Sequence, residues 1–80
     1  MFRYTDEEAN VLDPILLDIF VESDGPIKLG KLERMLVVRM DRIREYDPKI
    51  RISDDRIYEY VHARISENVL EEVVSGMYTI

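Results

Sequence analysis

The segment "RIYEYVHARISENVLEEVVSGMYTI", residues 56–80, decides the fold of this 80-residue chain. Its apolar residues first recur with a helical period of about 3.6 and then alternate with a period of two around Ser75-Gly76. Gly76 can supply the positive φ that a tight hairpin needs, and the four residues that follow it are good strand formers. This change of period predicts a helix that is followed directly by a small hairpin.

The same segment permits a second interpretation, in which the third helix continues as far as Val74. Two apolar series keep an interval of four residues: Ile65, Val69 and Val73, and then Leu70 and Val74. Gly76 would then be a C-cap, and the chain would form a histone-like or bundle-forming helical dimer. Short apolar runs do not distinguish strand from helix, so both interpretations remain open at this point.

Length and composition indicate one small domain over residues 1–80. The chain is 46% hydrophobic and 35% charged, which is too apolar for a disordered segment, and it has no cysteine for a disulfide or a thiolate metal site. Its apolar runs are far shorter than the ~20 residues of a membrane helix, and its N-terminus shows no signal or leader pattern. We therefore expect a soluble cytoplasmic protein, and the small size makes a homodimer a secondary expectation.

Charge is unevenly distributed along the chain, whose formal net charge is -6. Residues 1–27 carry one basic and seven acidic side chains, whereas residues 28–64 carry ten basic and seven acidic ones, a net of +3. Residues 65–80 add three more acids. The middle of the chain is therefore basic between two acidic ends, so a polyanion and a basic protein both stay open as partners.

Capping residues and turn signals define the remaining elements. Thr5 and Glu8 form a capping-box pattern for a first helix, although Pro14 would also suit a helix that begins at Asp13. The sequence Ser-Asp-Gly-Pro at 23–26 ends this helix.

A short strand and two helices are expected after that turn. Alternation between Ile27 and Leu29 predicts a very short strand, and a second helix runs from Lys31 until Asp47-Pro48 stops it. Residues 49–53 are an extended link or a short strand. Ser53 is a good N-cap for a third helix over residues 54–66. The predicted order is helix, strand, helix, link, helix, hairpin, which is an α+β chain.

The third predicted helix has two different faces. The apolar face carries Ile57, Tyr58, Val61 and Ile65, and the roughly opposite face carries Arg56, Glu59, Ala63 and Ser66. Tyr60 and His62 lie at the borders. We expect Tyr60 to be an exposed aromatic that contacts a base, a sugar or a partner protein.

This order of elements resembles the winged helix-turn-helix family and is similar to compact archaeal and phage-type repressors. The resemblance is carried by "ILLDIFVESDGPIKLGKLERML", residues 15–36, and by the C-terminal segment quoted above. It implies a three-helix winged helix-turn-helix with a C-terminal β-hairpin, whose third helix enters the DNA major groove while the wing touches the backbone or minor groove. The DNA-binding residues implied by the resemblance are Lys28, Lys31, Arg34, Arg56, Tyr60, Ala63, Arg64, Ser75, Gly76 and Met77.

Two functions follow from these observations. The favoured one is a transcription regulator that binds double-stranded DNA in a sequence-specific way, supported by the basic middle of the chain. The alternative is a protein-interaction module, in which the acidic first helix or the wing docks onto a basic partner in transcription or replication machinery, or acts as a small viral inhibitor. The net charge of -6 and the uncharged wing tip favour this alternative.

Catalysis and metal binding have no support in the sequence. The chain has no Gly-rich phosphate loop and no nucleophile-histidine set, and none of its acid pairs belongs to a recognisable pocket motif. It has a single histidine and no cysteine, so we expect neither a metal site nor a cofactor.

Overall fold

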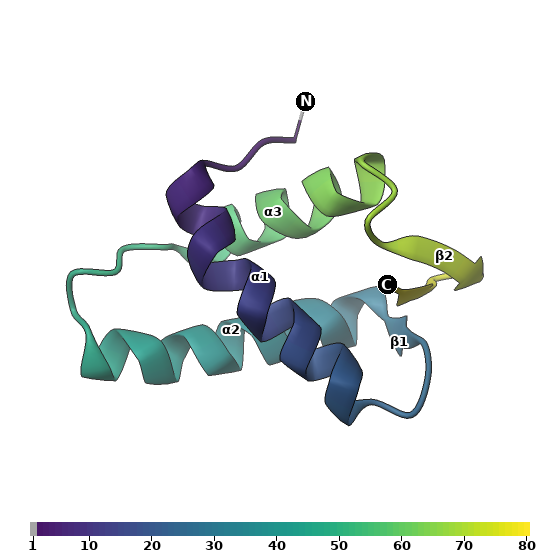
Figure 1. Ribbon diagram of the computed structural model, residues 1–80, viewed down its shortest axis with the longest axis horizontal. Coiled ribbons are helices and arrows are strands. Elements are labelled where there is room, and N and C mark those ends of the chain that lie inside the picture. Colours follow the sequence, from purple (N-terminus) through teal and green to yellow (C-terminus); the bar gives the residue numbers. More distant parts are fainter. Residues whose placement is uncertain (1) are drawn as a thin grey trace.

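Three helices and a small antiparallel sheet make up the computed structural model, which describes residues 2–80. The elements are α1 (Asp6–Glu22), β1 (Ile27–Lys28), α2 (Leu29–Tyr46), α3 (Asp54–Ser66), β2 (Glu71–Val74) and β3 (Met77–Thr79). Figure 1 shows α1 crossing in front of the other helices, with the strands gathered at one end of the molecule. The predicted α+β class, with three helices and a C-terminal hairpin, is confirmed, and the arrangement is compatible with a winged helix-turn-helix.

The first helix begins at its capping box. The Thr5 hydroxyl accepts the Glu8 N–H at 3.1 Å, and the Glu8 carboxylate accepts the Thr5 N–H at 2.7 Å. The alternative start at Asp13 is therefore wrong, and Pro14 lies inside α1. Proline removes one backbone donor from a helix, but α1 continues past it because its inward face, from Leu12 to Ile19, is buried.

The second helix begins two residues earlier than predicted, at Leu29 rather than Lys31. No side chain among residues 2–80 caps it. Its first N–H is satisfied from the hairpin instead, because Leu29 donates to the Gly76 carbonyl at 3.1 Å. The third helix has the predicted bounds, and the Ser53 hydroxyl accepts the Arg56 N–H at its start. The link between these helices, residues 47–53, contains no strand.

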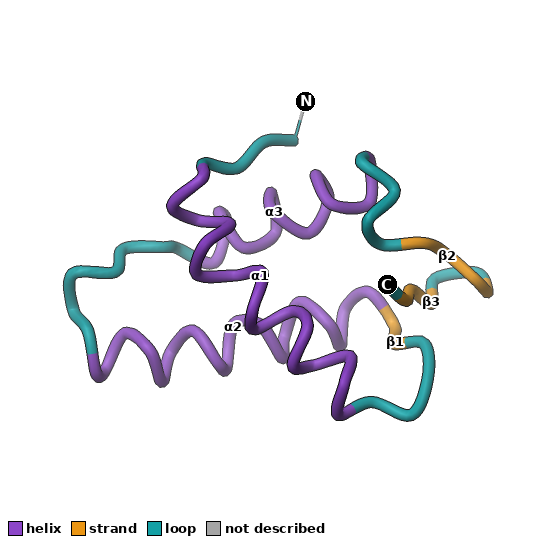
Figure 2. Tube along the Cα trace, viewed as in Figure 1, coloured by secondary structure: helices purple, strands orange, loops and turns teal. Residues whose placement is uncertain are grey.

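The segment after Ser66 leaves the helix and forms the predicted hairpin, so the interpretation with a helix continuing to Val74 is wrong. Asn68 has a φ of 61°, in the left-handed region that asparagine tolerates better than most residues, and the turn it makes directs Leu70 into the core. The strand order is β1-β3-β2, all antiparallel, with Tyr78 opposite both Ile27 and Glu72. Figure 2 shows the three short strands together at the end of the molecule opposite the link.

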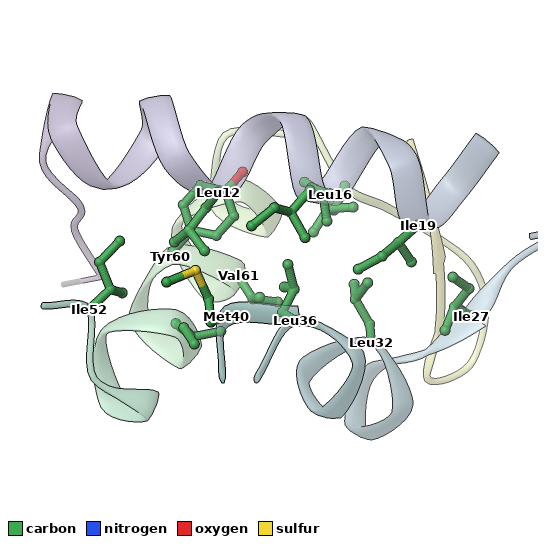
Figure 3. Close-up of a cluster of buried hydrophobic side chains, with 13 residues drawn as sticks. Leu12, Leu16, Ile19, Ile27, Leu32, Leu36, Met40, Ile52, Tyr60 and Val61 are labelled. Carbon is green, nitrogen blue, oxygen red and sulfur yellow. The ribbon is translucent and has the colours of Figure 1, made fainter. Parts of the chain in front are cut away.

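The core lies between the three helices and is closed by residues from the link and the hairpin. Its side chains are Leu12, Ile15, Leu16, Ile19, Ile27, Leu32, Leu36, Met40, Ile52, Ile57, Tyr60, Val61 and Leu70. Figure 3 shows α1 covering this cluster from one side, with Leu36 and Val61 facing it from α2 and α3. Burial of each large apolar side chain stabilises the fold by about 1.5–3 kcal/mol. The α3 side chains in this cluster therefore determine which face of α3 is turned toward the core.

Candidate interaction surface

The first arginine of α3 is directed toward the start of α1. Arg56 donates from Nε and from a terminal nitrogen to the two Glu8 oxygens, at 2.7 and 2.8 Å. The hydrogen bonds from Arg56 hold the pKa of the Glu8 carboxyl at about 2, below its ordinary value of 4.5, although burial alone would raise it. Arg56 also donates to the Arg3 carbonyl at 3.2 Å. It is a structural ion-pair partner in this arrangement.

The second arginine of α3 also forms an ion pair with an acid of α1, further toward the C-terminus of each helix than the first pair. Arg64 donates to both Asp13 oxygens at 2.7 Å and to Glu67 at 3.2 Å. Its guanidinium carbon lies 4.5 Å from the centre of the Tyr4 ring and 5.4 Å from that of Tyr60, within range of cation–π attraction. Only 15% of its side chain is exposed. Arg64 is therefore also turned away from the outer surface of α3.

The prediction that Tyr60 is an exposed contact residue is wrong. Tyr60 is fully buried, and its hydroxyl donates to Asp13. Burial, together with this hydrogen bond, raises the pKa of the Tyr60 phenol. Figure 3 places Tyr60 in the core cluster with Leu12 and Met40. The physical reason is that a buried tyrosine needs a partner for its hydroxyl, and α1 supplies one.

Ala63 is likewise buried, with 4% of its surface exposed, so its predicted role as a DNA contact is also wrong. The inward face of α3 runs through Ile57, Tyr60 and Val61, rotated from the predicted apolar face. Tyr58, predicted to be inward, is 39% exposed. It lines a small cleft with Arg34 and other residues of α2.

The N-terminal residues 2–5, which we call the N-terminal arm, lie along the outer flank of α3. The Phe2 ring stacks on His62 with the ring centres 4.8 Å apart, and the Arg3 N–H donates to Glu59 at 3.1 Å. The Tyr4 hydroxyl contacts both Glu67 oxygens, at 2.8 and 2.9 Å. The arm therefore covers part of the helix surface that a DNA groove would receive. No local pattern in residues 2–5 predicts this contact.

The hairpin of β2 and β3, residues 71–79, is the segment that we call the wing. It is short, and the backbone at its tip is hydrogen-bonded to the start of α2. Ser75 and Gly76 form the two-residue loop, in which Gly76 has a φ of 76° as predicted, and Met77 is half-buried. The Gly76 N–H donates to Glu72 at 2.8 Å, and its carbonyl accepts from α2. The loop carries no charged side chain that could reach phosphate.

Three predicted phosphate contacts are grouped at the start of α2. Lys28, Lys31 and Arg34 are exposed, and none of them forms an ion pair within residues 2–80. Lys28 lies opposite Met77 in the sheet, which places it beside the wing. The structure therefore places Lys28 beside the wing and the other two cations in the first turns of α2, whereas the two arginines of α3 pair with α1.

The surface of α3 and the wing is acidic. Residues 53–80 contain two arginines, both ion-paired inward, and six acids, a net charge of -4. We call these six side chains the acidic surface: Asp54, Asp55, Glu59, Glu67, Glu71 and Glu72. Phosphate would be repelled here, whereas a basic protein surface would be attracted.

Comparison of the chain with protein-family models, with curated proteins and with solved structures found no match. Across residues 2–80, no group of three histidine, cysteine or acidic side chains is placed to hold a metal ion. No helix in that range combines the length and apolar content needed to cross a membrane.

Proposed function

We propose that this chain is a winged-helix protein-interaction module, and that its acidic surface docks onto a basic partner protein. The observation that carries the proposal is the inward pairing of Arg56 with Glu8 and of Arg64 with Asp13. These pairs leave α3, among its own described residues, with carboxylates and no unpaired arginine on its outer side. Docking of such a surface onto a basic one gains charge complementarity and fast association.

Recognition of a specific DNA sequence by α3 is disfavoured for the same reason. Protein–DNA affinity comes largely from cations that neutralise phosphates, and a helix in the major groove lies between two phosphate backbones. To use its arginines, α3 would have to break two ion pairs with α1. The N-terminal arm would also have to leave its place over His62 and Glu59.

A second candidate is sequence-independent binding of duplex DNA through the start of α2. Its specific support is the group of exposed, unpaired cations Lys28, Lys31 and Arg34 beside the wing. Three phosphate contacts give weak binding that falls steeply between about 50 and about 200 mM salt. In this mode Arg56→Ala leaves DNA affinity unchanged, whereas Lys31→Glu with Arg34→Glu abolishes it.

Photo-crosslinking tests the first proposal. A photoreactive amino acid replaces Tyr58, which is half-exposed next to the acidic surface, or Lys49, an exposed control position in the link. Nuclease-treated extract from the source cells should yield a protein adduct from position 58 and none from position 49. The adduct should disappear when Asp55→Lys and Glu71→Lys are added, since neither of these carboxylates has a side-chain partner in the described chain.

Fluorescence anisotropy with a mixed-sequence duplex completes the test. We expect no saturable binding at physiological salt. Tight binding of the duplex that is lost in Arg56→Ala would refute the proposal and would support DNA binding by α3. An adduct that survives the two charge reversals would place the partner on another surface.

A further inference from the structure

An open groove of about 690 Å³ lies between α1 and α2. Met35, Val38 and Ile43 provide its apolar lining from α2, and Tyr46 stands at its end. Tyr46 is 91% exposed and Val38 is 48% exposed. This apolar surface is separate from the acidic surface and is not used by the function proposed above.

The two walls of the groove carry opposite charge. Arg34 and Arg42 belong to the α2 wall, are exposed, and form no ion pair with any described residue. Arg39 pairs across the groove with Glu22, which holds α1 and α2 together there. Asp18 stands on the α1 wall. The chain as a whole has a net charge of -6, so these two unpaired arginines beside apolar side chains form a positively charged surface on an otherwise acidic protein.

We propose that this groove binds an acidic amphipathic helix of a partner protein. Charge complementarity identifies the occupant, because Arg34 and Arg42 attract carboxylates while the apolar lining between them takes hydrophobic side chains. A nucleic-acid backbone would satisfy the arginines but would leave Met35 and Val38 against a charged strand. The proposal does not depend on the partner of the acidic surface.

The spacing of the two arginines specifies the partner helix. Arg42 lies eight positions after Arg34, which is about 12 Å along α2. On a partner helix, carboxylates at positions i and i+7 are about 10.5 Å apart on one face, and apolar residues at i+3 and i+4 lie between them. The recognised pattern is therefore acid-x-x-apolar-apolar-x-x-acid, with the two acids placed over the α2 wall rather than beside Asp18.

A designed helical peptide with the pattern Glu-x-x-Leu-Leu-x-x-Glu is a suitable probe. Isothermal titration calorimetry compares it with the same peptide carrying lysine at both glutamate positions. We expect the glutamate peptide to bind the wild-type chain at least about tenfold more tightly, a difference of about 1.4 kcal/mol. The double variant Arg34→Glu/Arg42→Glu should reverse this preference, and amide NMR shifts should map the peptide to Met35 and Val38.

The control variant is Lys49→Glu/Arg51→Glu, which reverses two exposed and unpaired cations in the link and should leave peptide affinity unchanged. Failure of the glutamate peptide to bind, equal affinity for both peptides, or an equal loss in the control variant would overturn the proposal. So would a concentration-dependent dimer abolished by Arg34→Glu/Arg42→Glu, because a second copy would then be the occupant. Competition by duplex DNA that persists in Lys28→Glu/Lys31→Glu would overturn it in favour of a phosphate backbone, because those two lysines belong only to the second candidate's DNA site.

Discussion

Replacement of Glu8 by glutamine should measure how strongly α1 is attached to α3. Glutamine keeps an oxygen that can accept the Thr5 N–H, so the capping box can persist, but it removes the charge that faces Arg56. The change therefore isolates the ion pair from the helix cap. We expect Glu8→Gln to fold normally and to be less stable than wild type at neutral pH.

The size of the loss follows from the pKa of Glu8. A carboxyl whose pKa falls from 4.5 to about 2 on folding contributes at most about 3.4 kcal/mol, at about 1.36 kcal/mol for each pH unit. The Arg56 side chain is 39% exposed, so solvent screens the pair, and we expect about 1–2 kcal/mol at pH 7. Because the folded pKa lies below the unfolded one, the contribution is present above about pH 5 and is lost as the pH falls from 4.5 toward about 2.

Urea unfolding followed by far-UV circular dichroism checks both statements. The stability difference between wild type and Glu8→Gln should fall below half its neutral value by about pH 3. Glu7→Gln is the matched control, since Glu7 is in the same helical turn but is exposed and has no ion pair in residues 2–80, and it should change stability by less than about 0.5 kcal/mol. A difference that does not depend on pH would refute the ion-pair reasoning.

The structure also determines the sign of the stability change for four further substitutions, all measurable by the same unfolding experiment. Asp13→Asn leaves Arg64 without its bidentate carboxylate and should cost about 2 kcal/mol, less than a fully buried pair because Asp13 is partly exposed. Gly76→Ala places a Cβ at a φ of 76° and should cost about 1 kcal/mol, whereas Gly30→Ala in α2 meets no atom within 4 Å and should gain about 0.5 kcal/mol. Leu36→Ala opens a cavity at a fully buried site and should cost about 3 kcal/mol.

Local signals in the sequence were sufficient for most of the fold. Thr5 with Glu8, Ser53, and Gly76 each act over a few residues, so the starts of α1 and α3 and the hairpin loop could be predicted without tertiary information. The hairpin itself followed from the change of period after Ser66. The early start of α2 could not be predicted, because the group that satisfies Leu29 belongs to the wing, far along the chain.

The candidate surface was harder to predict, because the orientation of α3 is decided by contacts with distant residues. Helical spacing predicted Tyr58 on the inward face of α3 and Tyr60 at its border. In the structure the Tyr60 ring packs in the core cluster, and its hydroxyl donates to Asp13, which lies 47 residues earlier. The same long-range contacts pair Arg56 and Arg64 with α1, so a count of basic residues overestimated the positive charge that α3 presents to a partner.

The two ion pairs between α1 and α3 join residues that are 48 and 51 positions apart. During synthesis on the ribosome, α1 emerges before α2 and α3, and its apolar face is only partly covered, by α2, until α3 has been translated. A pause within the codons for residues 47–53 would lengthen that interval, and α1 is the segment to which a chaperone would bind. Translation speed through the link therefore sets how long the nascent chain is at risk of aggregation.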